Sequence, residues 1–422
     1  MTASQNAILA SAPGKVILFG EHAVVYEKPA IAASLALRTY AWLEPTHATT
    51  AGANPPLVRL RLPDICPDPI EWDSGRLETL ARLHGKGDNA KTPTPEALSS
   101  LAEVVILESL AQLQSSPTTQ AAAAFLHLYL CICWRHQATP KPLPPIEICV
   151  RSALPVGAGL GSSASYSVAI ATALLAYSGH LDGGNLTTTD MDLINGWAFM
   201  AEKVIHGNPS GIDNALATYG GAKLYTKGKL ETVDGFSAFR FLLTDTQVPK
   251  NTKKQVEGFR TRKERYPAVM NHLIEAVEGI ALECRRLFEA KDQNSEHVSQ
   301  DEVYEVMETL IDMNHSIMAA SGVSHPSLES VRQITALHGL RSKLTGAGGG
   351  GCALTLIRHD TTRETLDTIK TSLTAQGFRC YETEVGCPGV RISRSPGKDG
   401  DVRSRFWAGE GVEWRMMDEG VA

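Results

Sequence analysis

The chain has 422 residues, of which 43% are hydrophobic and 20% are charged, the balance of a globular protein with a large core. Its 40 basic and 46 acidic residues give a formal net charge of −6, which does not favour nucleic acid as a partner. At this length we expect two domains rather than one.

The first predicted element is a strand at residues 16–19, an apolar run that follows the turn residues Pro13 and Gly14. A glycine and the charged pair Glu21 and His22 come directly after this strand. The polar, proline-bearing segments 85–96, 115–119 and 137–145 predict surface loops on either side of an alanine-rich helix.

A second strand is predicted at residues 146–151, and it leads into the glycine-rich segment 157–163. The small residues that follow predict a helix that runs to about residue 177. The order is therefore strand, glycine loop, helix. A further helix at residues 191–206 ends at the helix-breaking cluster 207–211, and Asp213 follows that cluster.

The turn-rich region 223–234 is the best candidate for a boundary between two halves. Helical patterns follow at 250–292 and 301–321, and the glycine run 345–351 interrupts a return to strand between residues 343 and 356. We predict an α+β fold with a first domain at 1–228, a second at 229–394, and a loosely held tail at 395–422.

The eight cysteines include no C-x-x-C pair, so we interpret them as reduced thiols. Residues 1–10 lack the pattern of a signal peptide, and the apolar stretches 121–134 and 166–177 fall short of the roughly 18 residues that a membrane span needs. We expect a soluble cytoplasmic protein without a membrane partner.

The segment from Gly157 to Ser163 has the composition of a phosphate-binding loop. A glycine loop that opens a helix presents unpaired N–H groups and the positive end of the helix dipole to an anion. A tight strand-to-helix connection without a ligand explains a lone loop equally well. A dinucleotide fingerprint would need glycine where Ser162 stands, so an NAD-dependent oxidoreductase is the weaker alternative.

Phosphoryl transfer needs Mg²⁺, a cation near the transferred charge, and a base for the acceptor hydroxyl. Ser162 or Ser163 with Glu202 offers hard oxygen ligands for Mg²⁺, and Asp213 with Lys15 offers a base beside a cation. Each residue also has a structural explanation: Glu202 on a solvated helix face, Asp213 as a helix cap, Lys15 as a surface charge and His22 as a loop histidine.

Three motifs in order make the chain similar to the GHMP kinases: APGKVILFGEHAVVY at 12–26, PVGAGLGSSA at 155–164 and LTGAGGGGC at 344–352. Within that superfamily, EKVIHGNPSGIDNA at 202–215 and VPKNTK at 248–253 resemble the mevalonate kinases. The resemblance implies an N-terminal domain like ribosomal protein S5 domain 2 and a C-terminal GHMP kinase α+β domain, with the active cleft between them.

The resemblance also implies an ATP-dependent phosphotransferase that acts on the C5 hydroxyl of mevalonate. Asp213 would orient or deprotonate this hydroxyl with Lys15 beside it, Ser163 and Glu202 would hold Mg²⁺, and Glu21 and His22 would line the mevalonate end of the cleft. ATP would contact Lys15 and the following residues: Ser152, Gly157, Ala158, Gly159, Leu160, Gly161, Ser162 and Ser163. Homodimers and feedback inhibition by prenyl diphosphates are further expectations from the family.

Some positions depart from the family pattern. Family members often carry asparagine where this chain has Asp64, and the loops 85–94 and 140–145 look like elaborations. The alternatives are a sister kinase, acting on phosphomevalonate, homoserine or galactose, and a catalytically inactive member that binds its ligand. The joint presence of Lys15, Ser163, Glu202 and Asp213 disfavours the inactive member.

Overall fold

The computed structural model describes residues 7–46, 56–84, 117–133, 143–155, 157–181, 185–236, 239–249, 251–293, 299–394 and 400–409. Helices and strands are mixed along these ranges, which confirms the α+β class. The loop predicted at 85–94 and residues 140–142 of the second loop lie outside the described residues. No helix in the described ranges has the length and apolar character needed to cross a membrane.

The first half is built around an antiparallel pair of long strands, β1 (Ile8–Phe19) and β2 (Ala30–Pro45). The other edge of β2 pairs with β5 (Ile146–Ser152) and with β6 (Ala222–Thr226). The sheet continues from β5 to β3 (Leu57–Leu62) and β4 (Cys66–Asp73), and β7 (Lys229–Thr232) extends it beyond β6.

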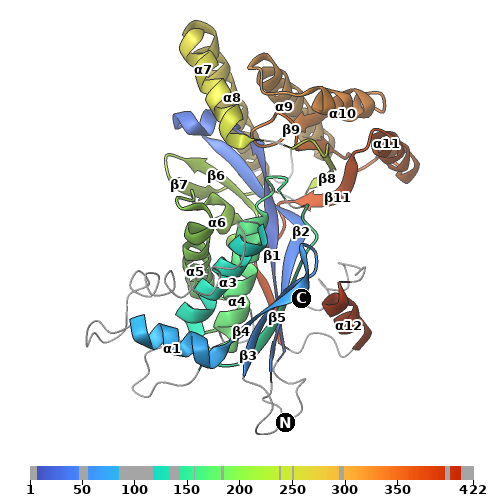
Figure 1. Ribbon diagram of the computed structural model, residues 1–422. Helices are drawn as coiled ribbons and strands as arrows, with labels where there is room; N and C mark the ends of the chain where they lie inside the picture. The colour runs from blue at the N-terminus through green and yellow to red at the C-terminus, as the bar shows by residue number, and fades with distance from the viewer. Residues whose placement is uncertain are drawn as a thin grey trace.

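Four helices cover one face of this sheet: α3 (Pro117–Cys133), α4 (Ser162–Tyr177), α5 (Thr188–His206) and α6 (Ile212–Tyr219) (Figure 1). Every residue of α4 from Ala164 to Ala176 is buried, because α4 packs against the sheet on one side and against helices on the others. Its small side chains make this close packing possible. The helix α1 (Ser74–His84) follows β4 at the edge of the sheet.

The second half holds a smaller sheet in the order β11 (Arg379–Val385), β8 (Phe239–Asp245), β10 (Cys352–Leu356), β9 (Ser342–Leu344). Its helices are α7 (Thr252–Arg265), α8 (Pro267–Gln293), α9 (Gln300–Ala320), α10 (Pro326–Ala336) and α11 (Arg363–Ala375). The helical pattern predicted at 250–292 divides at Pro267, because proline lacks the N–H that a continuous helix needs and restricts the residue before it.

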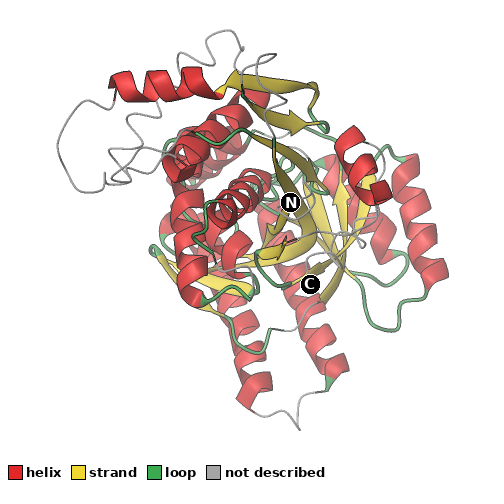
Figure 2. Cartoon of the chain, turned by 90° about the horizontal axis from the view of Figure 1, so that it is seen from below, coloured by secondary structure: helices red, strands yellow, loops and turns green. Residues whose placement is uncertain are grey.

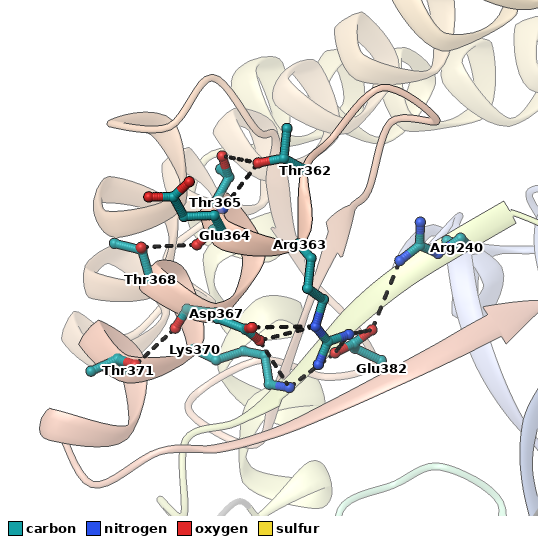
Figure 3. Close-up of polar contacts among 10 residues, drawn as sticks. All are labelled: Arg240, Thr362, Arg363, Glu364, Thr365, Asp367, Thr368, Lys370, Thr371 and Glu382. Atoms are coloured by element: carbon teal, nitrogen blue, oxygen red, sulfur yellow. Dashed lines mark hydrogen bonds and ion pairs between the residues drawn. The ribbon is translucent and has the colours of Figure 1, made fainter.

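The helix α11 is fastened to β11 by an exposed ion-pair cluster around Glu382 (Figure 3). Arg363 Nη1 and Lys370 Nζ each donate to Glu382 at 2.9 Å, and Arg240 lies 3.8 Å from the same carboxylate. Exposed pairs of this kind contribute little individually. Because each charged group of the cluster is paired within it, we interpret the cluster as a link between α11 and β11.

The two halves share one continuous sheet, and the chain returns to the first half at its end. β2 meets β11 through the single pair Leu35 and Val385. β12 (Arg391–Arg394) then pairs with β1, although it falls within the range predicted for the second domain. Figure 2 shows the strands and their covering helices from below.

The tail predicted as loosely held at 395–422 is instead packed in its described part, which forms α12 (Gly400–Ala408). Phe406 is fully buried in a cluster with Leu9, Tyr40, Trp42 and Cys149. These strand residues alternate with Ala10, Ala41, Leu43 and Ile148, which belong to the core under α4. Successive side chains of a strand point to opposite faces, so α12 covers the face of the sheet that α4 leaves open.

Candidate active site

A cleft of about 830 Å³ lies between the two halves, and the three glycine-rich or charged segments singled out in the sequence all contribute to its wall. These segments are more than 130 residues apart in the chain. The predicted site residues that line the cleft are Lys15, Glu21, His22, Ser152, Gly157, Gly159, Gly161, Ser162, Ser163 and Asp213. The other three predicted residues do not line the cleft. Ala158 and Leu160 point into the core, and the carboxylate of Glu202 lies buried behind Ser163.

The glycine loop before α4 takes a backbone conformation that its glycines make possible. Gly157, Gly159 and Gly161 have φ angles of 73°, 76° and 73°, in the left-handed region that other residues rarely adopt. The intervening Ala158 and Leu160 are buried and anchor the loop, and the Leu160 carbonyl accepts a hydrogen bond of 2.8 Å from the Lys15 N–H. The loop therefore sits directly against β1.

Lys15 and Asp213 form an ion pair within the cleft, with 3.3 Å between Nζ and Oδ1. The Lys15 side chain is only 12% exposed, so it is not an ordinary surface charge. Asp213 lies in the first turn of α6, but the cap position is occupied by Gly211 and no side chain caps the helix. Asp213 is therefore not a helix cap, and its carboxylate, with 37% of the side chain exposed, is open to the cleft.

Glu202 is the centre of a small hydrogen-bond network at the start of α4. Ser163 Oγ and Ser167 Oγ each donate to its carboxylate at 3.1 Å, and His206 Nε2 lies 3.1 Å from Ser163 Oγ. With its side chain 4% exposed, Glu202 does not lie on a solvated helix face. Burial, aided by the Asp213 carboxylate, raises the pKa of Glu202 to about 7, although the two serine hydrogen bonds lower it.

The pair formed by Ser163 and Glu202 suits a magnesium ion that also binds a phosphate. A hydroxyl and a carboxylate are hard oxygen ligands, and Mg²⁺ usually takes only one or two carboxylates from a protein and completes its shell with phosphates and water. Within the described ranges, no group of three or more His, Cys, Asp or Glu side chains could hold a metal by itself. The donor set therefore fits a cation that arrives with a phosphorylated substrate.

Ser152, at the end of β5, is fixed in the cleft wall by two neighbours. Its hydroxyl lies 2.9 Å from Thr39 Oγ1, and its N–H donates to Asp64 Oδ2 at 2.8 Å. The other oxygen of Asp64 accepts from Arg151 Nε at 3.1 Å and Nη2 at 3.0 Å. Asp64, which had no role from the sequence, thus orients both Ser152 and Arg151 on this side of the cleft.

Glu21 and His22 also line the cleft, and their polar atoms contact the second half of the chain. His22 Nε2 donates to the Ala347 carbonyl at 2.9 Å, and its ring stacks on Phe259 with 4.7 Å between centroids. Burial lowers the pKa of His22, so the ring is neutral at pH 7. The Glu21 carboxylate forms an ion pair with Lys343. His22 is therefore more than a loop histidine, since it joins two motifs.

Several residues that contact these side chains, among them Ser167, His206, Lys343 and Asn314, were not singled out from the sequence. Ser167 and His206 stand four positions after Ser163 and Glu202, so helical spacing could have identified them as same-face partners. Lys343 and Asn314 gave no such signal, because they lie about 300 residues from Glu21 and only the fold brings them to it.

The chain is similar to known proteins over most of its length. The family described as GHMP kinases N terminal domain matches residues 99–221, and GHMP kinases C terminal matches residues 301–377. The mevalonate kinase of Homo sapiens is 42% identical over 94% of this chain and 97% of its own length, and that of Bos taurus is 42% identical over 94% and 97%. A mevalonate kinase structure from Methanococcus jannaschii shares the fold with a TM-score of 0.62 at 20% identity, over 89% of this chain and 97% of that one. The chain belongs to the mevalonate kinase family of the GHMP kinases.

Proposed function

We propose that the protein is an ATP-dependent mevalonate kinase, which phosphorylates the C5 hydroxyl of (R)-mevalonate to give 5-phosphomevalonate and ADP. This reaction belongs to the mevalonate route to isoprenoids and sterols. The observation that carries the proposal is the ion pair between Lys15 and Asp213 at 3.3 Å, beside a glycine loop that opens a helix in the same cleft.

Asp213 acts on the acceptor hydroxyl in this proposal. Its carboxylate orients the hydroxyl and takes up its proton as the oxygen attacks the γ-phosphorus, while the bond from that phosphorus to the ADP oxygen breaks. The Lys15 ammonium, 3.3 Å from Asp213, stabilises the negative charge of the transferred phosphoryl group. Both side chains are held before substrate binds, so little reorganisation is needed.

The loop from Gly157 to Ser163 and the first turn of α4 hold the phosphates of ATP. The N–H groups there lack side-chain caps, and the α4 dipole favours negative charge at this end. Lys15 approaches the same phosphates, and Ser152, at the end of β5, contacts the nucleotide from the neighbouring wall. The buried Ala158 and Leu160 fix the loop beneath.

Ser163 and Glu202 would hold Mg²⁺ together with the ATP phosphates. When bound, the ion neutralises charge that develops on the phosphate oxygens. Glu202 would bind the cation as a carboxylate, a form that a pKa of about 7 makes available at neutral pH. Ser167 and His206 keep the carboxylate and the Ser163 hydroxyl oriented.

Glu21 and His22 form the mevalonate end of the cleft, and the glycine loop 345–351 closes it from the second half. Gly346 and Ala347 of this loop line the same cleft as the phosphate loop. Exclusion of water at this point matters, because water competes with the acceptor hydroxyl for the phosphoryl group.

Three wider expectations accompany the proposal. The family resemblance favours a homodimer and feedback inhibition by prenyl diphosphates at the ATP site, and the apolar cleft residues Leu62, Ile65 and Leu154 would suit a prenyl chain. A cytoplasmic location fits the cysteines, all of which lie in described ranges without forming a disulfide.

The deciding experiment measures ADP release from Mg·ATP with mevalonate, phosphomevalonate, homoserine and galactose as acceptors. We expect turnover with mevalonate alone, and a loss of about 10²–10⁴-fold in kcat for Asp213→Asn, as for removal of a general base. Asp367→Asn on α11 is the control, since it makes the same change outside the cleft.

Turnover of a different acceptor in place of mevalonate would support the assignment as a kinase but reject mevalonate as its substrate. Full activity of Asp213→Asn would reject the assignment of the base. Binding of ATP without turnover of any acceptor would favour an inactive ligand-binding protein.

A further inference from the structure

Lys343 is a lysine with almost no access to solvent at the junction of the two halves. Its side chain is 1% exposed, and its ammonium group contacts the Glu21 carboxylate, donates to the Leu344 carbonyl at 2.8 Å and lies 5.6 Å from the centre of the Phe19 ring. Glu21 itself lines the cleft. A cation from the second half thus stands directly behind a cleft residue of the first half.

The Glu21 carboxylate is held through both of its oxygens, and both donors come from the second half. Lys343, on β9, bonds Oε1, and Asn314 Nδ2, on α9, donates to Oε2 at 3.2 Å. A carboxylate with both oxygens engaged by buried donors has one available orientation. The arrangement therefore fixes the direction of the Glu21 side chain and the course of the backbone that leads to His22.

Neighbouring contacts join the same two segments. Thr345 Oγ1 donates to the Ile17 carbonyl at 2.9 Å, and His22 Nε2 donates to the Ala347 carbonyl at 2.9 Å. Together with the bond from Lys343 to Glu21, these contacts connect the first motif to the third glycine loop and to the strand before it. Lys343 precedes that loop by two residues.

The strand that carries Lys343 is itself fixed from behind. His315 Nδ1 accepts the Leu344 N–H at 3.2 Å, and its Nε2 lies 3.0 Å from Glu329 Oε1. Ser324 donates to the same oxygen of Glu329. The side chain of His315 is 1% exposed, so this support is part of the interior.

The energetics argue against stability as the reason for the pair. Removing two charges from water costs several kcal/mol each, and apolar residues of similar volume often serve a core equally well or better. A buried pair does, however, define one geometry, because breaking it leaves an uncompensated charge. Here the buried pair fixes the orientation of Glu21, a residue of the cleft wall.

We propose that Lys343 and Asn314 are positioning residues, which hold Glu21 and the adjoining His22 in the orientation that shapes the acceptor end of the cleft. The second half of the chain would then set acceptor binding without touching the acceptor. The inference rests on the proposed function for its kinetic test, and it has a structural test that needs no activity.

The kinetic test compares Lys343→Met and Asn314→Leu with the wild type. Lys343→Met nearly keeps side-chain volume, Asn314→Leu keeps the branch at Cγ, and each removes a donor to the carboxylate. We expect the KM for mevalonate to rise about 10-fold or more, as for loss of a hydrogen bond to a charged group, while the KM for ATP changes less than about two-fold. Equal increases in both KM values, or none, would overturn the proposal.

Ser342→Ala is the matched control, because Ser342 neighbours Lys343 on β9 and is equally buried. Its hydroxyl lies 2.6 Å from Thr335 Oγ1 and 2.7 Å from Thr355 Oγ1, away from Glu21. We expect this variant to melt at a lower temperature with an unchanged KM for mevalonate. A raised KM in the control as well would show a general loss of packing and overturn the specific role.

The double variant Glu21→Gln/Lys343→Met separates positioning from stability. It removes both charges, so it should regain thermal stability lost in Lys343→Met while the KM for mevalonate stays raised. Recovery of both the thermal stability and the wild-type KM for mevalonate would show that the pair has only a structural role. The double variant and Asn314→Leu also decide the matter if Lys343→Met fails to fold.

The structural test measures amide hydrogen exchange at residues 20–26 in the ligand-free proteins. Faster exchange is expected in Lys343→Met and Asn314→Leu, but not in Ser342→Ala. Unchanged exchange in both of the first two variants would overturn the proposal whatever the activity. Failure of the wild type to phosphorylate mevalonate, by contrast, would reject the proposed function and leave this measurement intact.

Discussion

Lys15 reaches Asp213 by passing a backbone position that has no side chain. A Cβ atom at Gly161 would lie 2.9 Å from Lys15 Cγ, and Gly161 has a φ of 73°. Both the space and the backbone conformation therefore require glycine. Gly161 thus leaves space for the Lys15 side chain, in a loop that we also propose as the phosphate-binding site.

Gly161→Ala should lower both activity and stability. The added methyl group would displace Lys15, so we expect kcat to fall about 10-fold or more, along with a loss of about 1–2 kcal/mol for the strained φ. Gly179→Ala is the control, because Gly179 has a φ of 75° and a methyl group there would meet no described atom within 4 Å. Its stability should fall similarly with activity unchanged, and equal activity of the two variants would contradict the explanation.

His127, on α3, is a titratable group buried in the core of the first half. Burial lowers the pKa of His127 from 6.5 to about 4, and its Nδ1 has no hydrogen-bond partner in the described part of the chain. As pH falls below 6.5 the unfolded chain binds a proton that the folded chain does not. The free energy of unfolding must therefore decrease from pH 6.5 down to about 4.

We expect His127→Leu to lose less stability in acid than the wild type does. Between pH 7.5 and 5 the wild type should lose about 2 kcal/mol more than the variant, measured by urea unfolding. The exposed His272 provides the control substitution. A parallel loss in wild type and His127→Leu would contradict the role given to His127.

Single residues of the site could be predicted because several of them stand inside motifs. Lys15, Ser163, Glu202 and Asp213 were all named from the sequence, and the structure brings them to one place. The partner of Glu21 could not be predicted, since Lys343 looks like an ordinary charged residue and its burial follows from tertiary packing.

Among the helices and strands, α4 and β5 were predicted close to their observed bounds from local sequence patterns. The strand β2 was not predicted, although it has 16 residues and is the most connected strand of the sheet. Its sequence begins with alanines and lacks a clean alternation, and both of its faces are covered. Strand formation there is decided by pairing with β1, β5 and β6 rather than by propensity.

Phe406 should anchor α12 to the sheet. We expect Phe406→Ala to cost about 3–5 kcal/mol if the cavity persists, and less if α12 detaches. The kcat should not change, because no described side chain of α12 lines the cleft. Thermal unfolding and the standard kinetic assay measure the two effects. Leu337→Ala, at a position 85% exposed, is the control and should change neither.

The fold of the whole molecule depends on residues 387–394, which follow the predicted domain boundary but pack against β1 and β2 of the first half. Arg38, on β2, is 2% exposed and donates to the carbonyls of Pro388 at 3.1 Å and Gly389 at 2.6 Å. Ser34 Oγ donates to the Cys387 carbonyl at 2.5 Å, and β12 then completes the pairing of β1. The first half therefore contains a segment from the end of the second.

A fragment of residues 1–228 should not fold by itself, even though it spans the predicted first domain. It would lack β12, and the buried Arg38 would lose two of its acceptors, a cost of about 1–3 kcal/mol for each unmet group. Circular dichroism and one-dimensional NMR of the fragment measure this. Joint expression with residues 229–422 should restore a folded complex, and a stable isolated fragment would contradict the expectation.

The contact between the two sheets has a mechanical consequence. In the part of the chain that the structure describes, Leu35 and Val385 are the single ladder pair between β2 and β11. A ladder of one residue pair offers little resistance to a twist of one sheet against the other, so the contacts that Ile17, Glu21 and His22 make with the second half limit the rotation. Closure of the cleft should therefore be a small rotation of one wall against the other that leaves both sheets intact.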